Sequence, residues 1–386
     1  MLRPFFASLV VALAFSSSCV DDTPGDGDGD GDGDGDGDGD GDGDGDGDGD
    51  GDGDGDGDGD GDGDGDGDGD GDGLCGQAPG QLLWPDAPWN TSVVDAPIDA
   101  ESDAIIAYLS TNHTAAARFQ IDFSFTLSVA DETVTPTPFT PTADHYTPDC
   151  DTAPIPIPDD ATLEGESGLA CTTDGDCHLL VVEPDTCRLY EMWRANITDT
   201  FEGGCLAVWD LSAPYPETLR GDCCTSADAA GLPIAAHLFT VDEVANGAIA
   251  HAIRFILPNA LMRERIYVRP ATHSTGATSG PADAPPYGAR LRLKQDVDIS
   301  GLNPAAQVVA QALKTYGMIL SDGGNLTFTA MSDQSSTSTP PLTWDDVGLG
   351  PHDLKDLAWS DFEVVFGGTR YTWDGACDCD RTPLTE

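Results

Sequence analysis

Residues 119–129 read Phe-Gln-Ile-Asp-Phe-Ser-Phe-Thr-Leu-Ser-Val, with a large apolar side chain at every second position from Phe119 to Leu127. This alternation is typical of a β-strand that buries one face. A second pattern predicts a hairpin, because residues 178–183 and 188–195 flank a Pro-Asp turn. Further strands are expected over 206–211, 250–257, 265–270, 289–294, 318–321, 326–331 and 362–366. Many short strands separated by turns predict a mainly-β fold, an antiparallel β-sandwich or jelly roll.

One or two helices are expected to pack on these strands. The pattern over residues 103–109 predicts a short helix with one apolar face. A stronger helix follows Asn303, a good N-cap, and ends at Gly317. Its predicted buried stripe is Ala305, Val308, Val309, Ala312, Leu313 and Tyr316. Residues 322–325, Asp-Gly-Gly-Asn, then predict a hairpin turn with Asp322 as the turn former.

Residues 25–73 are an unbroken Gly-Asp repeat that holds 24 of the 70 acidic residues. The repeat has no apolar side chain, so nothing offsets the entropy lost on ordering it. A calcium-binding β-roll also alternates Gly and Asp, but it needs a periodic apolar residue that is missing here. We expect residues 20–74 to be a disordered spacer and residues 75–386 to be one globular domain. The domain carries 44 acidic and 15 basic residues.

The net charge of that domain, −29, argues against several partners. Nucleic acid and anionic lipid both attract Lys and Arg, and the whole chain has three lysines. We therefore expect a monomer that binds no nucleic acid and meets a membrane only through a lipid anchor.

The first 19 residues resemble a bacterial lipoprotein signal. Arg3 is followed by an apolar run over 5–15, too short to span a bilayer, and then by three serines and Cys19. Ser16 stands where such signals usually carry Leu, so a plain secretory signal is the alternative. The favoured interpretation is lipidation of Cys19 and an exported protein anchored in the outer membrane, facing the exterior or the periplasm.

Ten further cysteines in an exported chain predict a disulfide framework. Cys171 and Cys177 are close enough in sequence to close a small loop. Cys223 and Cys224 are adjacent and are expected to bond to different partners. Ten cysteines allow too many connectivities to deduce, but a bond from Cys75 to Cys377 or Cys379 could tie the ends of the domain together. No C-x2-C pairs mark a zinc site, and no metal or cofactor is expected.

Several stretches together resemble a family of exported microbial proteins. The clearest are His-Ala-Ile-Arg-Phe at 251–255, Lys-Thr-Tyr-Gly-Met-Ile-Leu at 314–320 and Ser-Asp-Phe-Glu-Val-Val at 360–365. Others are Pro-Trp-Asn at 88–90, Cys-Arg-Leu-Tyr-Glu at 187–191 and Ser-Ala-Asp-Ala-Ala-Gly-Leu-Pro at 226–233. The resemblance covers most of residues 84–366 and implies an exported single domain. No activity is established for the family, so it implies no catalytic residues.

The motifs of several enzyme classes are missing from the sequence. It contains no Gly-x-Ser-x-Gly nucleophile elbow, no His-Glu-x-x-His zinc motif and no Gly-rich nucleotide-binding loop. What remains is a set of polar and aromatic residues within or beside strands. The candidate catalytic residues are Glu191, His251 and Arg254, and the candidate binding residues are Tyr190, Trp193 and His273.

Glu191 is the first choice among these because it shares an apolar strand face with Leu189 and Trp193. A carboxylate there is costly unless it is paired or belongs to a site. The alternative is a structural pair with an arginine. His251 and Arg254 lie three residues apart and should point to opposite faces of their strand. Structural roles are the alternative for both.

Two functions of different classes fit these residues. In the first, the domain is a carbohydrate-active enzyme, a polysaccharide hydrolase or lyase with carboxylate, His and Arg beside sugar-stacking aromatics. In the second, it is a non-catalytic surface module that binds polysaccharide or protein. Two carboxyl groups in one open groove would favour the enzyme, and a flat aromatic face without such a pair would favour the binding module.

Overall fold

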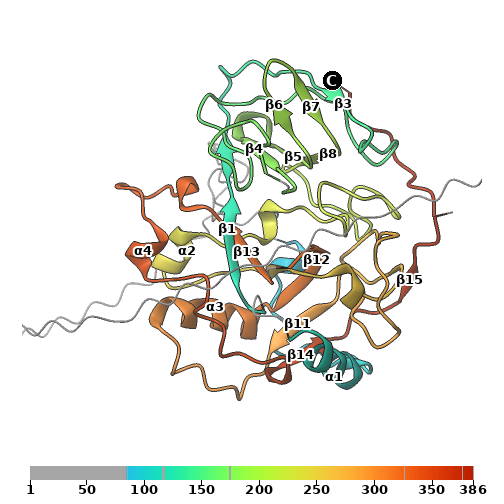
Figure 1. Cartoon of the computed structure of the whole chain (residues 1–386), viewed down its shortest axis with the longest axis vertical. Coiled ribbons are helices and arrows are strands. Elements are labelled where there is room, and N and C mark those ends of the chain that lie inside the picture. The colour runs from blue at the N-terminus through green and yellow to red at the C-terminus, as the bar shows by residue number, and fades with distance from the viewer. Residues whose placement is uncertain are drawn as a thin grey trace, which may run out of the picture. The chain divides into compact units, whose positions relative to one another are not determined.

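The alternating stretch at 119–129 forms two strands that belong to different sheets. β1 (Ile121–Phe125) and β2 (Leu127–Val129) flank Thr126. The ladder breaks there because the backbone N–H of Leu127 donates to the hydroxyl of Ser335 at 3.0 Å. In Figure 1 this segment is the long cyan ribbon that climbs from the lower sheet to the upper one.

A computed structural model describes Trp84 and residues 86–114, 118–173, 175–325, 327–375 and 377–385. These residues belong to one compact unit. The predicted signal, Cys19, the Gly-Asp spacer and Cys75 lie outside the described residues.

The lower sheet has six strands in the order β1-β13-β9-β12-β11-β14. The further bounds are β13 Phe328–Met331, β9 Ile253–Leu257, β12 Met318–Gly323, β11 Arg290–Leu293 and β14 Phe362–Val365. β1 pairs with β13, and β12 with β9, in parallel; the remaining pairs are antiparallel. The predicted mainly-β fold is confirmed, with mixed sheets in which parallel pairs join the antiparallel ones.

The hairpin predicted at 322–325 does not form between neighbouring strands. β12 and β13 do not pair with each other, because β9 lies between them in the sheet. Asp322 is a residue of β12 itself, at the end of the strand. The residue expected to shape a turn instead places its carboxyl group at the end of the sheet.

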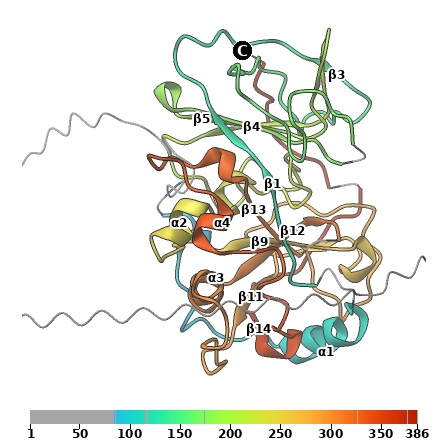
Figure 2. The ribbon, with the colours of Figure 1, turned by 60° about the vertical axis from the view of Figure 1, so that its left-hand side comes forward.

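In the part of the chain that the structure describes, four α-helices lie around the lower sheet: α1 Ser102–Asn112, α2 Val241–Ala245, α3 Pro304–Thr315 and α4 Trp344–Val347. α1 packs on β14 and α3 on β11, while α2 contacts both α3 and α4 (Figures 1 and 2). Asn303 caps α3 as predicted, accepting from the Ala306 N–H at 2.8 Å. Gly317 follows the helix with φ +73, where a Cβ would lie 2.5 Å from the Leu291 carbonyl oxygen. Short 3-10 helices lie at Pro88–Asn90, Pro184–Thr186, Ala235–His237, Asn259–Leu261, Asp333–Ser335 and Trp359–Asp361.

The upper sheet has the order β2-β4-β5-β8 and lies between two hydrophobic cores. Its other strands are β4 Leu179–Glu183, β5 Arg188–Met192 and β8 Leu206–Asp210, and β4 and β5 form the predicted hairpin. Leu180, Val182 and Trp209 face the large core shared with the lower sheet. Val181 and Met192 face a smaller core above. Burial on both faces explains why β4 is apolar along most of its length rather than alternating.

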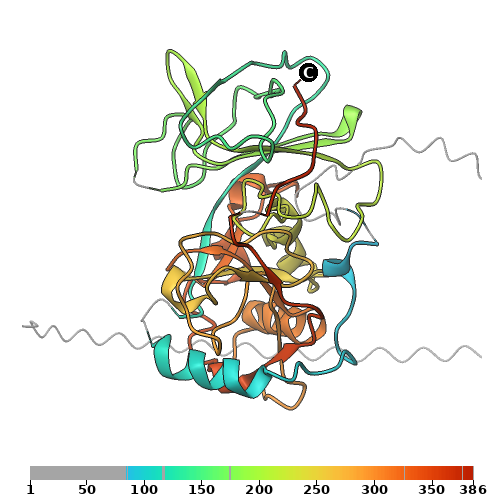
Figure 3. The ribbon, with the colours of Figure 1, turned by 90° about the vertical axis from the view of Figure 1, so that its right-hand side faces the viewer.

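Two small sheets complete the fold. β3 (Thr140–Pro141), β7 (Phe201–Gly203) and β6 (Asn196–Ile197) form one at the top of Figure 1. β10 (Ile266–Tyr267) pairs with β15 (Tyr371–Thr372) in the other. After β15 the chain runs up to the upper layer, as Figure 3 shows, where the Thr152 N–H donates to the Leu384 carbonyl at 2.8 Å.

The described cysteines are all in disulfides, which indicates an oxidising or extracellular environment. The described bridges are Cys150–Cys205, Cys171–Cys177, Cys223–Cys377 and Cys224–Cys379, and Cys187 is bridged too. The predicted loop at 171–177 and the separate partners of Cys223 and Cys224 are confirmed. The suggested bond from Cys75 to Cys377 or Cys379 is wrong, because both are taken. Among the described residues, no helix is long and apolar enough to cross a membrane.

A buried ion pair joins the two layers. His178, just before β4, contacts Glu164 through Nδ1 at 2.6 Å and the carbonyl of Ala227 through Nε2 at 3.1 Å. Burial lowers the pKa of His178, but the charge and hydrogen bond of Glu164 outweigh it and raise this pKa to about 9. The pKa of Glu164 is lowered, since its pair with His178 outweighs the effect of burial.

This pair predicts how stability changes with pH. Because the folded pKa of His178 lies above the unfolded value, its contribution is complete below about pH 6.5 and is lost as the pH rises through 9. We expect His178→Gln to remove roughly 3 kcal/mol of the pH-dependent stability between those values. Urea unfolding at pH 6.5 and pH 9 measures it, with exposed His352→Gln as the control. Parallel pH curves for wild type and His178→Gln would contradict the assignment.

Candidate functional site

A cavity of about 550 Å³ opens between the upper layer and the ends of the central strands of the lower sheet. We call it the polar cavity. Its size is within the range of small-molecule sites. The polar and aromatic side chains that line it include Tyr146, Asp149, Asp176, Trp193, Asn259, His273, Tyr287, Asp322 and Trp373.

Two carboxyl groups and one guanidinium form the floor of the polar cavity. Arg254, in β9, donates through Nη2 to Asp228 at 2.8 Å and to Asp322 at 3.3 Å. Asp228 and Arg254 are buried, whereas the Asp322 side chain is 19 % exposed and lines the cavity. Asp322 is therefore the member of the trio that a ligand in the cavity can touch.

Asp322 is held by backbone as well as by Arg254. Its Oδ1 accepts from the Gly323 N–H at 2.7 Å, and its Oδ2 from the Ala229 N–H at 3.3 Å. A register shift between Leu320 and Asp322 in the pairing of β12 with β9 alters the regular ladder just before the carboxyl group. Such irregularities often re-aim a side chain at a site.

Disulfides and one glycine position Asp228. Cys223 and Cys224 anchor the start of its loop to the C-terminal segment. At the end of the loop, Gly231 has φ +77, and a Cβ there would lie 2.1 Å from the Thr272 hydroxyl, so no other residue fits without a shift. The loop is also tied to β12, since the Ala230 N–H donates to the Ser321 carbonyl at 2.9 Å.

The floor favours a proton on Asp322 at neutral pH. Burial and then the neighbouring charge of Asp228 raise the pKa of Asp322 to about 8, while Arg254 acts in the opposite direction. Burial also raises the pKa of Asp228, although Arg254 and a side-chain hydrogen bond with Asp322 lower it. Two carboxyl groups that hydrogen-bond to each other need one proton between them. Asp322 carries that proton and is a candidate general acid.

His273 supplies a neutral base on the same cavity. Its Nδ1 lies 2.8 Å from the Ala229 carbonyl, which can only accept, so Nδ1 carries the proton and Nε2 is the free acceptor. Burial is the main cause that lowers the pKa of His273, and the ring is therefore neutral at pH 7. The ring also makes an edge contact with Trp373 at 5.0 Å.

Three aromatic side chains, Tyr146, Trp193 and Trp373, form what we call the aromatic rim. Tyr146 is 50 % exposed, and the two tryptophans are half-buried. Exposed aromatic faces around a polar cavity are suited to stacking on sugar rings, whose C–H faces are apolar.

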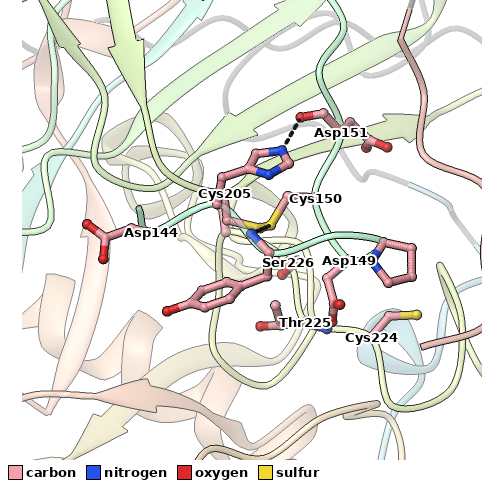
Figure 4. Close-up of a disulfide and its surroundings, with 12 residues drawn as sticks. Asp144, Asp149, Cys150, Asp151, Cys205, Cys224, Thr225 and Ser226 are labelled. Atoms are coloured by element: carbon pink, nitrogen blue, oxygen red, sulfur yellow. Dashed lines mark hydrogen bonds between the residues drawn. A yellow bond between two sulfur atoms is a disulfide. The ribbon is translucent and has the colours of Figure 1, made fainter. Parts of the chain in front are cut away.

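Two carboxylates lie beside the rim. Asp176 accepts from the Trp193 indole N–H at 2.9 Å, and Asp149 from the Thr225 N–H at 2.9 Å. Figure 4 shows Asp149 and Thr225 beside the Cys150–Cys205 bridge, which joins the Asp149 segment to the start of β8. Each aspartate has a second oxygen without a donor among the described residues. Asp176 is also close enough for its charge to raise the pKa of Asp322.

The polar cavity gathers half of the residues proposed from the sequence. Arg254 lies at its floor, and Trp193 and His273 line it. The other three lie elsewhere. Tyr190 faces the small upper core, and the ring of His251 lies 3.3 Å from a Glu243 oxygen. As expected, His251 and Arg254 do not share one site.

Glu191 is fully buried and lines neither described cavity. One oxygen accepts from the Trp209 indole at 2.9 Å and the Ile234 N–H at 3.0 Å, and the other from the Ala235 N–H at 2.8 Å. The expected alternative partner, an arginine, is not among these described donors. Burial raises the pKa of Glu191, and the three hydrogen bonds oppose that shift. This geometry favours a structural role, binding the 3-10 helix at Ala235–His237 to the upper sheet.

Glu191→Gln should therefore act on folding rather than on turnover. A glutamine amide would turn an N–H group toward donors, leaving at least one of them unsatisfied, so we expect a loss of about 1–3 kcal/mol in unfolding free energy. Exposed Glu202→Gln is the control in urea unfolding. Full stability with turnover reduced by orders of magnitude would instead support the catalytic interpretation of Glu191.

Sequence reasoning missed Asp322, Asp228, Asp176, Tyr287 and Trp373. Asp322 was assigned to a turn, and Asp228 lay unnoticed within the stretch at 226–233. One signal was available: the stretches at 226–233, 251–255 and 314–320 that carry the family resemblance supply or adjoin the floor. Asp228 and Arg254 lie within the first two stretches, and Asp322 follows the third by two residues.

Two other features of the described residues carry less chemistry. A larger groove of about 770 Å³ is lined mostly by apolar residues such as Trp84, Pro214 and Phe366. A cluster of metal-ligand types combines Glu166 with Cys171 and Cys177, but these cysteines are bonded to each other and cannot act as thiolate ligands.

Comparison of the chain with models of protein families, with curated proteins and with solved structures finds no match.

Proposed function

We propose that the protein is an exported polysaccharide hydrolase whose active site is the polar cavity. The observation that carries the proposal is a partly exposed Asp322, in contact with Arg254 and lining the same cavity as the aromatic rim; the pKa of Asp322, raised to about 8, supports its role as an acid. An aromatic rim can stack a sugar ring, and an acid that keeps its proton at neutral pH can give it to a glycosidic oxygen.

Asp322 is the general acid in this mechanism. Donation of its proton to the leaving oxygen would break the glycosidic bond and leave Asp322 ionised. Arg254, 3.3 Å away, would then stabilise the new charge. Asp228 is too close to Asp322 for a sugar to lie between them, since both contact the same nitrogen of Arg254. Its role is to set the proton affinity of Asp322.

Asp176 is the second carboxylate. It lines the cavity, its charge acts on Asp322, and it has an oxygen free to accept. There it would activate the attacking water or form the bond to the sugar, as the second carboxylate of glycosidases does. Trp193 orients it through the indole hydrogen bond.

Hydrolysis is favoured over elimination. A polysaccharide lyase acts on uronates and must neutralise their carboxylate, which calls for a cation in the site. The described residues lining the cavity include no Lys or Arg. Arg254 lies beneath the lining, already in contact with two aspartates.

The test is a screen of the purified protein against neutral, amino-sugar and uronate polysaccharides, followed by reducing-end release. Asp176→Asn should abolish the release, and Asp296→Asn, an exposed aspartate outside both cavities, should not. Binding of a glycan with no cleavage of any substrate would favour the alternative, a non-catalytic module that uses the same aromatic rim. If Asp176→Asn and Asp296→Asn both keep full activity, the polar cavity is not the active site.

We also propose that the mature protein is anchored through a lipid on Cys19 in the outer membrane. The leader at 1–19, the spacer and the disulfides of the domain support it. Val20 follows the cysteine, so no acidic residue is present there to signal retention in the inner membrane. Cys19→Ala should release the protein into soluble fractions on cell fractionation. If the variant sediments with membranes as wild type does, the anchor is wrong.

A further inference from the structure

The charges that line the polar cavity have one sign. Asp149, Asp176 and Asp322 are its acidic residues, and the described lining includes no Lys or Arg. His273 lines it too, but burial keeps its ring neutral. Asp322 holds a proton, so the lining carboxylates free to meet a ligand's charge are Asp149 and Asp176.

Cations close to the lining are already engaged. Arg220 and Arg381 donate to the Asp149 carbonyl at 2.8 and 2.9 Å, and both pair with Asp151. Arg254 contacts Asp228 and Asp322 from below. Arg194 pairs with Asp144 at 3.2 Å and lies over the Trp193 ring. Arg265 lies over the Trp373 ring, 5.5 Å from its centre, and does not line the cavity.

Both carboxylates lie in loops that line the cavity, and each is fixed by one hydrogen bond. The Asp149 oxygen that accepts from the Thr225 N–H fixes the first, and the Trp193 indole fixes the second. Each leaves one oxygen to a ligand. A cationic group held by such a carboxylate would lie in the same cavity as the aromatic rim, whose ring faces attract cations.

The net charge of the whole domain also favours cationic ligands over anionic ones. Residues 75–386 carry a net charge of −29, which repels polyanions and concentrates cations near the surface. A polyuronate would have to approach this field and then place a carboxylate beside Asp149 and Asp176.

We propose that the polar cavity selects glycans that contain a protonated amino sugar, with Asp149 as the specificity-determining residue that receives the ammonium group and the charge of the catalytic Asp176 adding to the attraction. This inference rests on the proposed function for the place where the glycan binds, and it names the substrate class. Trp193 or Trp373 stacks the ring, and the exposed side chain of Asn259 is available to sugar hydroxyls.

Binding is measured by calorimetry on the purified Asp322→Asn protein, which separates binding from cleavage. The probes are hexamers of glucosamine, of N-acetylglucosamine and of galacturonic acid, at about pH 6, where a sugar amine is protonated. We expect the glucosamine hexamer to bind about tenfold more tightly than the N-acetylated one, and the galacturonate hexamer to bind more weakly than both. The preference should shrink as salt is added.

Adding Asp176→Asn or Asp149→Asn should reduce the glucosamine preference several-fold, whereas the matched change Asp296→Asn should leave it unchanged. Galacturonate binding as tight as glucosamine binding overturns the inference, as does an unchanged preference in both lining variants or no binding of any hexamer. If the glucosamine preference appears but wild type cleaves no glycan, the hydrolase proposal fails and the charge selection stands. If wild type hydrolyses polyuronates, the hydrolase proposal stands and the charge selection fails.

Discussion

Asp322→Asn should reduce glycan hydrolysis by roughly a hundred- to ten-thousand-fold, the contribution typical of a positioned general acid. With its nitrogen at the Oδ2 position, the amide can donate to Asp228 while its oxygen still accepts from the Gly323 N–H, so the floor should survive. It gives up only the longer contacts of Oδ2 with the Ala229 N–H and with Arg254, both 3.3 Å. Wild-type activity should also fall as the pH rises through about 8, because Asp322 then loses the proton that it must donate. Initial rates across the pH range, for wild type and for Asp322→Asn, measure both effects.

Compared with wild type, the Asp322→Asn variant should lose activity but gain stability at high pH. The folded pKa of Asp322 lies far above the unfolded value of 3.8, so the stability it contributes is complete below that value and is lost as the pH rises through 8. Asparagine does not ionise, and we expect the variant to be more stable than wild type above about pH 8. A variant that keeps wild-type turnover, or one that is less stable at high pH, would remove Asp322 from the acid role.

Arg254→Met should cost about 3–5 kcal/mol of unfolding free energy, the second large effect. Arg254 and Asp228 are both buried, and removing the guanidinium leaves the Asp228 carboxylate without its ionic partner. Urea unfolding measures the loss. The matched control is Arg194→Met, whose pair with Asp144 is exposed and should be worth at most about 1 kcal/mol.

A double variant separates the ion pair from simple packing. If the loss comes from an uncompensated charge, adding Asp228→Leu to Arg254→Met should restore much of the stability, since buried ion pairs can often be replaced by apolar residues. A double variant as unstable as the sum of the single variants would mean that the two residues do not act as a pair.

Local patterns predicted the elements of this fold because local physics determines them. The hairpin of β4 and β5, the capped α3 helix and the alternation in β1 follow from turn chemistry, capping and burial. The order of the strands within a sheet does not follow from such local patterns. β9 lies between β12 and β13 because of contacts between residues distant in sequence. Local patterns therefore predict both β12 and β13 but wrongly pair them in a hairpin.

The site was partly predictable for the same reason. Arg254, Trp193 and His273 were chosen by residue type and strand position, and the fold brings them to one cavity. Glu191 shows the limit of that reasoning. A carboxylate on an apolar face needs partners, and here they are two backbone N–H groups and an indole that no sequence pattern places beside it.

Asp322 was misjudged because Asp-Gly-Gly is a strong turn signal, while the pKa of its carboxyl group depends on residues almost seventy positions or more away in the chain. Asp228 arrives from a loop held by two disulfides, and Arg254 from β9. Only the folded arrangement shows that the three share one charge balance.

The most direct test of the central claim is a crystal structure of the Asp322→Asn protein soaked with a glucosamine oligosaccharide. We predict a sugar ring stacked on Trp193 or Trp373, with a glycosidic oxygen within about 3 Å of the side chain at position 322 and Asp176 beside the same linkage. An oligosaccharide bound outside the polar cavity, or one in the cavity with its glycosidic oxygens out of reach of position 322, would contradict the account.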